Sequence, residues 1–433
     1  MMNKRIMKLA GPSILANITV PIVGMVDVAI AGRLGDAAYI GSIAIATMLF
    51  DLLYWNFGFL RVGTGGLTAQ AYGKRDFREA IKILIQSVGT ALIATAVIWA
   101  IQYFFVELSF IVIDTSEEVK SLACQYFYIR IWAAPATLSL FALKGWFIGM
   151  QNTISPMISD ITVNVTNLLY CLYFAIYLKM GVAGIALGTV AAQYTGLAVT
   201  LSILYIYYGK LFKHIDIRRS FKVNEIKSFF VMNSNLFIRS ICFLSVYAGF
   251  TSIAAEYGDT LLAVSTIMMK LMLLYSYFVD GFAYAGEALT GRYIGARDGK
   301  NLRKSIKLIF SWCIAIGLIS TLGYYFGGEA LFRLMTNNEV VIREARQFLP
   351  WLLIVPMAGC IGFTWDGIYV GATSSVALRN VMILSAIAFF LSYLIFKNSI
   401  GIQALWLGYT MHLVLRSLLM SVNAKKHVLS KVL

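Results

Sequence analysis

Residues 67–76 read LTAQAYGKRD and residues 289–298 read LTGRYIGARD, so a motif recurs 222 positions later in the chain. At the same offset, GWFIG at 145–149 corresponds to GIYVG at 367–371. Two further pairs follow at offsets of 221 and 220: Pro135 with Pro356, and GVAGIALG (181–188) with GIQALWLG (401–408). Four correspondences at a nearly constant offset indicate an internal repeat that covers both halves of the chain.

The composition places this repeat in a membrane. Of the 433 residues, 59% are hydrophobic and only 13% are charged, about half of the charged fraction of a soluble domain. Apolar runs of about 20 residues recur throughout, and each can cross a hydrocarbon layer of roughly 30 Å. We read the N-terminal run as a spanning helix and not as a signal peptide. The predicted spans are 8–32, 39–69, 83–106, 121–149, 155–178, 182–208, 226–255, 260–289, 305–326, 340–371, 375–396 and 401–422.

The repeat divides these twelve helices into two groups of six. The predicted organisation is an N-terminal six-helix bundle (1–208), a basic linker (209–225) and a C-terminal six-helix bundle (226–433). Since six is even, both halves enter the membrane from the same side, as parallel transporter repeats do. This all-α, pseudo-symmetric arrangement is typical of secondary transporters. A channel would more naturally be an oligomer around a filter sequence, and the chain has none.

The basic residues indicate the orientation. Most of the 36 Lys and Arg residues lie near the N-terminus, in the connections after even-numbered helices and at the C-terminus. The positive-inside rule therefore predicts that both termini are cytoplasmic, in the cell membrane. This asymmetry accounts for most of the net charge of +15 without a nucleic-acid partner.

Catalytic and metal-binding patterns are missing from the sequence. The five cysteines stand singly in apolar segments, the three histidines form no cluster, and there is no Gly-rich nucleotide loop. An enzyme or an ATP-driven pump is therefore poorly supported. We expect no cofactor and no bound metal, apart from a coupling ion.

One carboxylate stands out in the stretch PIVGMVDVAIAG at 21–32. Asp27 is its only charged residue, and an ionisable group inside a span costs about 2.5–3.5 kcal/mol on insertion scales. Burial favours its neutral form, so it could exchange a proton or a cationic ligand. Pro21 removes a backbone donor six residues earlier and predicts a hinge in this helix. The alternative is a structural carboxylic acid, hydrogen-bonded to a neighbouring helix.

Further polar residues lie inside the predicted spans. Asn164 and Asn167 are three apart and share a helix face, and they could complete a polar cavity with Asp27 and Thr189. Interhelical hydrogen bonding is the alternative. A possible second network lies in the C-terminal half, as a charge-compensated structural cluster or a second ion site: Arg239, Asp280, Glu287 and Asp366. We expect four other basic residues to be structural, near span ends or snorkelling: Arg61, Arg130, Lys144 and Arg416.

Four stretches resemble the multidrug and toxic compound extrusion (MATE) family, in its DinF-like branch. They are VDVAIAGRLG (26–35), FGFLRVGTGGLTAQAYG (57–73), DGFAYAGEALTGRYIGARD (280–298) and WDGIYVGATSS (365–375). The resemblance implies a V-shaped pair of six-helix bundles that exports organic cations or other amphipathic compounds in exchange for protons or sodium. It also implies that Asp27 is the coupling carboxylate, that helix 1 bends when this acid is protonated, and that Asn164, Asn167 and Thr189 occupy family polar positions.

The sequence departs from the family at Cys171, where many relatives carry a second acid. Either Asp27 couples alone, or acids of the C-terminal half contribute. The ion stays open, since Asp27 with Asn164, Asn167 and Thr189 could bind Na⁺ as well as tune a proton site. We expect a monomer acting on small amphipathic or cationic substrates. The alternative function is a flippase for lipid-linked precursors, a protein of the same superfamily fold.

Overall fold

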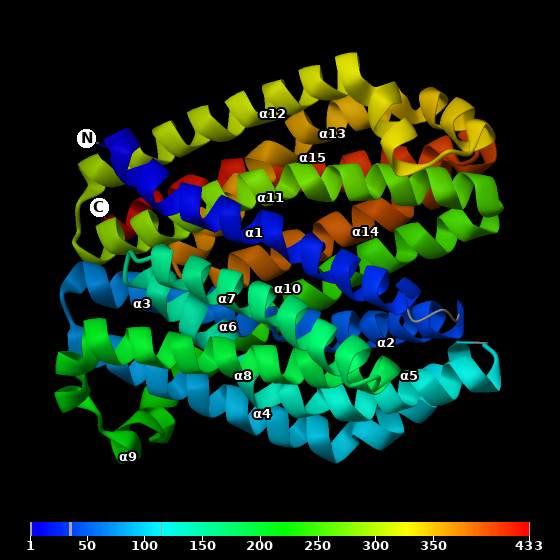
Figure 1. Cartoon of the computed structure of the whole chain (residues 1–433). Helices are drawn as coiled ribbons and strands as arrows, with labels where there is room; N and C mark the ends of the chain where they lie inside the picture. Colours follow the sequence, from blue (N-terminus) through cyan, green and yellow to red (C-terminus); the bar gives the residue numbers. More distant parts are fainter. Residues whose placement is uncertain (1, 34–36, 114, 433) are drawn as a thin grey trace. The chain divides into compact units, whose positions relative to one another are not determined.

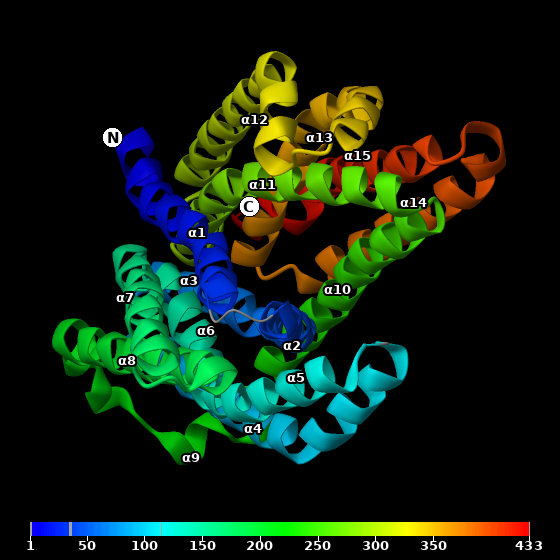
Figure 2. The ribbon, with the colours of Figure 1, turned by 45° about the vertical axis from the view of Figure 1, so that its right-hand side comes forward.

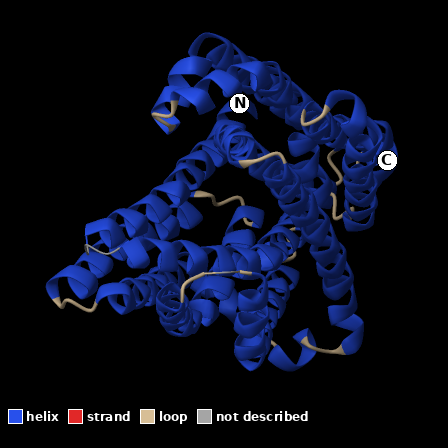
Figure 3. Ribbon diagram, turned by 90° about the vertical axis from the view of Figure 1, so that its right-hand side faces the viewer, coloured by secondary structure: helices blue, strands red, loops and turns tan. Residues whose placement is uncertain are grey.

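The computed structural model describes residues 2–33, 37–113 and 115–432. The side chains of 20–29, 31–33, 37, 112, 218–219 and 223–225 lie outside this description. The predicted hinge Pro21 and the predicted coupling residue Asp27 therefore have no described side-chain contacts. All regular secondary structure in the described chain is helical (Figure 3).

Twelve helical passes follow one another along the described residues (Figure 1). The first six are α1 (Met2–Arg33); α2 (Ala37–Trp55), continued by η1 (Asn56–Gly58) and α3 (Phe59–Lys74); α4 (Phe77–Val112); α5 (Glu117–Arg130), continued by η2 (Ile131–Ala133) and α6 (Ala134–Gly149); α7 (Ile154–Cys171), continued by the π-helical turn η3 (Leu172–Tyr177); and α8 (Gly181–Tyr208). The last six are α10 (Val223–Glu256), α11 (Asp259–Gly295), α12 (Gly299–Met335), α13 (Glu339–Gly371), α14 (Ser375–Ile400) and α15 (Gln403–His427). Three short helices complete the described chain: η4 (Gly209–His214), α9 (Ile217–Ser220) and η5 (Leu429–Val432).

Ten helical segments of the described chain are long and apolar enough to cross a membrane. The two predicted passes outside this set are α1, which is described only in part, and α7, whose polar residues include Asp160, Asn164 and Asn167. The protein is thus a multi-pass membrane protein with the predicted all-α architecture.

The repeated motif that ends in Arg-Asp forms the same tight turn twice. Arg75 and Arg297 adopt left-handed backbone conformations, with φ of 58° and 55°. The next residue caps the following helix: Asp76 accepts a hydrogen bond from the Glu79 N–H at 3.0 Å, and Asp298 accepts one from the Asn301 N–H at 3.0 Å. A side-chain acceptor at this position satisfies an otherwise unpaired donor of the first helical turn. The repeat in sequence is therefore a repeat in structure.

The paired motifs GWFIG and GIYVG form close helix crossings. A Cβ atom on Gly145 would overlap the carbonyl oxygen of Arg61 in α3, and one on Gly367 would overlap that of Ala283 in α11. One helical turn later, a Cβ on Gly149 would lie 2.5 Å from the Thr68 Cβ, and one on Gly371 3.0 Å from the Thr290 Cβ. Small residues four apart let helix backbones approach at van der Waals distance, the main source of helix association in membranes.

The chain packs as two compact units. The first unit comprises Leu15–Ala71 and Asp76–Phe230, and the second comprises Met1–Ile14, Tyr72–Arg75 and Val231–Leu433. The start of the main segment of the second unit, Val231, lies six residues after the predicted linker. The two units are not simply the first and second parts of the sequence. The first half of α1 and the end of α3 belong to the second unit.

Each unit has a central helix. In the first unit, α8 contacts α5, α6 and α7, and α4 packs on α6 (Figure 2). In the second unit, α13 contacts α11, α12, α14 and α15. The N- and C-termini both belong to the second unit and lie at the same end of it (Figure 1).

Candidate functional site

A polar seam joins three helices of the first unit. The Asn164 side-chain amide on α7 donates a hydrogen bond to the Thr19 hydroxyl on α1, at 2.7 Å. One turn further along α7, the Asn167 amide donates to the Thr189 hydroxyl on α8, at 3.0 Å. Thr189 in turn donates to the carbonyl oxygen of Ile185, at 3.1 Å. The structure therefore brings the predicted residues Asn164, Asn167 and Thr189 onto neighbouring helices, and it adds Thr19.

The Asn167 carboxamide leaves one acceptor unused. Its side chain is buried, with 1% of its surface exposed, and its Oδ1 has no hydrogen-bond partner among the described residues. A buried acceptor without a partner costs about 1–3 kcal/mol. Such an oxygen is suited to accept a hydrogen bond or to coordinate a cation.

Cys171 lies one turn beyond Asn167, where α7 passes into the π-helical turn η3. Its thiol donates to the Ile185 carbonyl at 3.4 Å, and the close crossing of Gly188 leaves little space around it. Residue 171 is therefore closely packed, and its thiol is only a weak hydrogen-bond donor. This chain therefore has no second carboxylate at that point of the seam.

The second unit contains a compact charged cluster around Asp366 on α13. The Arg239 guanidinium on α10 donates from Nη2 to Asp366 Oδ2 at 2.5 Å. The Arg416 guanidinium on α15 also donates to Asp366 Oδ2 and lies over the Phe363 ring, 5.1 Å from its centroid. One carboxylate thus holds two arginines from different helices, and it gives each a charge-assisted hydrogen bond.

Two other acids predicted for this network lie on α11. Asp280 is half-buried and acts electrostatically on Arg416, while Glu287 is buried at the crossing with Gly371. Asp280 therefore adds a second negative charge near the arginine pair. The cluster approaches charge neutrality, which reduces the penalty of placing it in a spanning region.

The expectation for Arg416 is wrong in one respect. Only 1% of its surface is exposed, so it does not snorkel to an interface but extends into the unit toward Asp366. Sequence reasoning missed it because its partner lies 50 positions away, on another helix. The other basic residues also have partners: Lys144 pairs with Asp160, and Arg130 donates to the Tyr126 hydroxyl at 3.2 Å.

We expect Asp366→Asn to destabilise the protein strongly. Two arginines would lose their shared carboxylate, and breaking a buried pair from one side costs about 3–5 kcal/mol. The measurement is the thermal unfolding of the purified protein. The control is Glu329→Gln, which removes an exposed carboxylate from Arg333 and Arg346 and should leave the midpoint unchanged. Equal midpoints for wild type and Asp366→Asn would contradict this reading of the cluster.

Comparison with known proteins agrees with the doubled architecture. The family model MatE matches the chain twice, over residues 12–173 and 236–396, close to the offset of the internal repeat. The chain belongs to the MatE family. It is accordingly a transporter of the multidrug and toxin extrusion type and not an enzyme.

Individual members of the MatE family cover almost the whole chain. The DNA damage-inducible protein F of Escherichia coli K12 is 32% identical over 98% of this chain and 92% of its own length. Two solved structures share the fold. An outward-facing multidrug resistance MATE family transporter has a TM-score of 0.88 at 17% identity, covering 99% of this chain and 96% of its own. The bent form of the Vibrio cholerae transporter VcmN has a TM-score of 0.87 at 17% identity, covering 99% and 98%.

Proposed function

We propose that this MatE-family transporter is a cation-coupled antiporter that exports organic cations or other amphipathic drugs and toxins. The coupling ion is H⁺ or Na⁺, and Asp27 is the coupling carboxylate. The transporter works as a monomer in the plasma membrane, with both termini cytoplasmic and without a cofactor. Binding of the external cation at Asp27 alters the bend of α1 around Pro21 and weakens substrate binding on the outward side.

The polar seam of the first unit is the observation that carries this proposal. Thr19 lies eight residues before Asp27 on α1, roughly 12 Å along a helix axis, and it accepts the Asn164 amide. The seam continues to Asn167 and Thr189, and the unused Asn167 Oδ1 adds an oxygen ligand. Neutral oxygen donors near a carboxylate suit either a proton or a sodium ion, whose ligands are oxygens.

The charged cluster of the second unit supports assigning the coupling role to the first unit. Asp366 is held by two arginines, so binding another cation there would have to displace a guanidinium. The same pairing weighs against the lipid-precursor flippase. A site for diphosphate headgroups needs cationic side chains that are free to bind phosphate, whereas Arg239 and Arg416 are engaged with a carboxylate.

Exchange requires that substrate and ion favour different conformations of the transporter. A ligand shifts such an equilibrium only by its difference in affinity for the two states. The amphipathic substrate enters from the cytoplasm or the inner leaflet, and the cation favours the state that releases it outside. Substrate and cation compete for binding near Asp27, and this competition gives each of them a different affinity for the two conformations.

The test is efflux of a fluorescent organic cation, such as ethidium, from proteoliposomes under separately imposed gradients. A proton antiporter is driven by the pH gradient alone, and a sodium antiporter by the Na⁺ gradient alone. Protein-free liposomes give the background leak. Efflux that follows neither gradient, together with translocation of a labelled lipid-linked diphosphate, would contradict antiport and favour the flippase.

A further inference from the structure

The segment between the sixth and seventh passes is docked on α4 of the first unit. The Gln86 side-chain amide on α4 donates to the Ser220 carbonyl oxygen at 2.8 Å, and both groups are buried. The Phe221 ring packs directly on Gly89, where any Cβ atom would overlap it. The segment from η4 to α9 is therefore a fixed part of the first unit and not a free tether.

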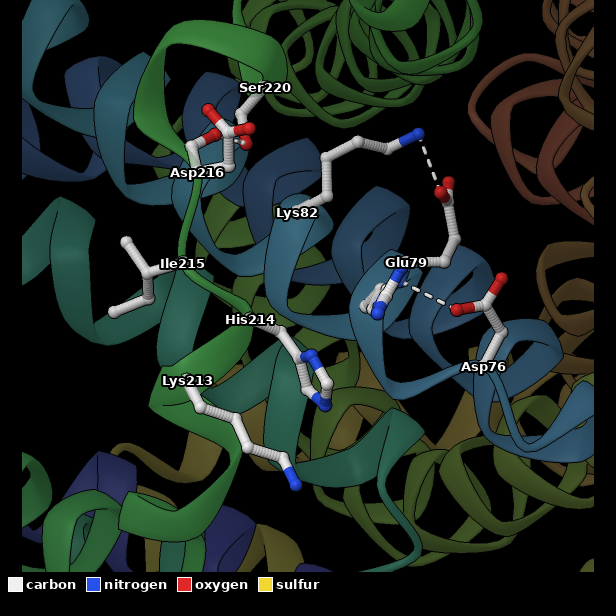
Figure 4. Close-up of a pocket in the computed structure, with 9 residues that line it drawn as sticks. Asp76, Glu79, Lys82, Lys213, His214, Ile215, Asp216 and Ser220 are labelled. Carbon is white, nitrogen blue, oxygen red and sulfur yellow. Dashed lines mark hydrogen bonds and ion pairs between the residues drawn. The ribbon is translucent and has the colours of Figure 1, made fainter.

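Docking this segment beside the start of α4 creates a pocket of about 420 Å³ (Figure 4). Its lining consists of Asp76, Arg78, Glu79, Lys82, Lys213, His214, Ile215, Asp216 and Ser220. The Lys213 and His214 side chains come from η4, and those of Asp76, Glu79 and Lys82 come from the beginning of α4 (Figure 4). The pocket is thus built by two segments more than 120 positions apart in the sequence.

Some of the charged side chains that line the pocket have partners within the protein, and others have none among the described residues. Asp76 accepts the Glu79 N–H as the helix cap, and the Glu79 carboxylate pairs with Lys82 at 2.5 Å. Arg78 and Lys213 take part in no hydrogen bond or ion pair with the described residues. Glu79 and Lys82 therefore neutralise each other, whereas the guanidinium of Arg78 and the ammonium of Lys213 remain available to an anionic ligand.

One apolar side chain, that of Ile215, lines the pocket, and Ile217 follows two residues later. Ile215 and Ile217 are 46% and 62% exposed and flank Asp216, although isoleucine is normally buried. A few residues earlier, Tyr205, Ile206 and Tyr207 at the end of α8 are even more exposed. Exposed tyrosines at a helix end are typical of the membrane–water interface. The segment therefore continues from the interface and carries two exposed isoleucines at and next to the pocket.

We propose that this pocket binds the phosphate of an anionic phospholipid, with Ile215 and Ile217 against its acyl chains. Arg78 supplies a planar set of donors for phosphate oxygens, and Lys213 supplies a point charge. The predicted cytoplasmic location agrees with this ligand, because basic residues near that leaflet attract anionic lipids. The site is separate from both Asp27 and the polar seam, so it can be tested whether or not the antiport proposal holds.

The test uses the full-length protein in nonionic detergent, titrated with phosphatidylglycerol or phosphatidylcholine and followed by native mass spectrometry. Wild type is expected to prefer phosphatidylglycerol. In Arg78→Gln/Lys213→Gln, the apparent Kd for phosphatidylglycerol should rise by about tenfold or more, at roughly 1 kcal/mol per basic residue. In Ile215→Ser/Ile217→Ser it should rise as well, because apolar contact is lost.

The matched control is Lys300→Gln/Arg303→Gln, which removes one lysine and one arginine from another basic pocket at the start of α12. It should retain the phosphatidylglycerol preference. An unchanged Kd in the Arg78/Lys213 variant would overturn the proposal. So would a loss confined to the α12 variant. An isoleucine variant that binds like wild type, with inorganic phosphate displacing the lipid, would instead identify a free-phosphate site and overturn the lipid assignment.

Discussion

Asp27→Asn is expected to reduce gradient-driven counterflow in proteoliposomes to the level of protein-free vesicles. Asparagine keeps the size and hydrogen-bonding capacity of the protonated acid but cannot release a proton or bind a cation by charge. The variant should therefore be fixed in one coupling state. Substrate binding to the detergent-purified protein, measured by fluorescence anisotropy, should persist, since the affinity-lowering ion no longer binds.

The control for this prediction is Asp51→Asn. Asp51 allows the same substitution of an acid by its amide on α2, in the same unit, and it takes no part in the polar seam. This variant should retain counterflow. If Asp27→Asn kept full drug-driven proton or sodium counterflow, the mechanism would be wrong, and the acids on α11 would become the next residues to substitute.

Gly367→Leu and Gly145→Leu are expected to prevent folding or to destabilise the protein severely. Each new side chain would meet the backbone carbonyl of the crossing helix, and backbone cannot rotate aside as a flexible side chain can. Overpacking a core usually costs about 1–3 kcal/mol, and overlap with backbone at these crossings should exceed that range. The measurement is the yield of monodisperse protein and its thermal midpoint.

Matched controls for these substitutions exist within α12. A Cβ atom at Gly323 or Gly327 would meet nothing within 4 Å. Leucine should be tolerated there, or stabilise the helix by about 0.5–1 kcal/mol because of its higher helix propensity. Wild-type midpoints for Gly145→Leu and Gly367→Leu would show that the two crossings are not closely packed.

The number and type of helices can be predicted because apolar run length is a local property. Several predicted spans stop short of the helix ends: the span predicted as 305–326 is the helix Gly299–Met335. Charged residues end an apolar run but not a helix, since a capping residue such as Asp298 decides where the first turn begins. The repeated Arg-Asp motif marks where α4 and α12 begin, but the turn and the helix cap that it forms are recognised only from the backbone angles and hydrogen bonds.

The candidate site is predictable to a lesser degree. Asn164, Asn167 and Thr189 can be grouped because helical spacing places them on defined faces. The pairing of Arg416 with Asp366 cannot, because no local pattern relates residues on α13 and α15. The free Oδ1 of Asn167 and the ion pair of Glu79 with Lys82 in the proposed lipid pocket likewise cannot be predicted from sequence. They depend on which side chains meet in the folded protein.

The helix that carries Asp27 belongs to both units. Residues up to Ile14 are grouped with the second unit and residues from Leu15 onward with the first, and Pro21 follows seven positions after Ile14. A continuous helix shared in this way is a mechanical linkage, so a displacement of one unit relative to the other must be absorbed by bending it. That bend would strain the Thr19–Asn164 hydrogen bond. Chain connectivity alone would then convert movement of the units into a change around the proposed ion site, and ion binding there into movement of the units.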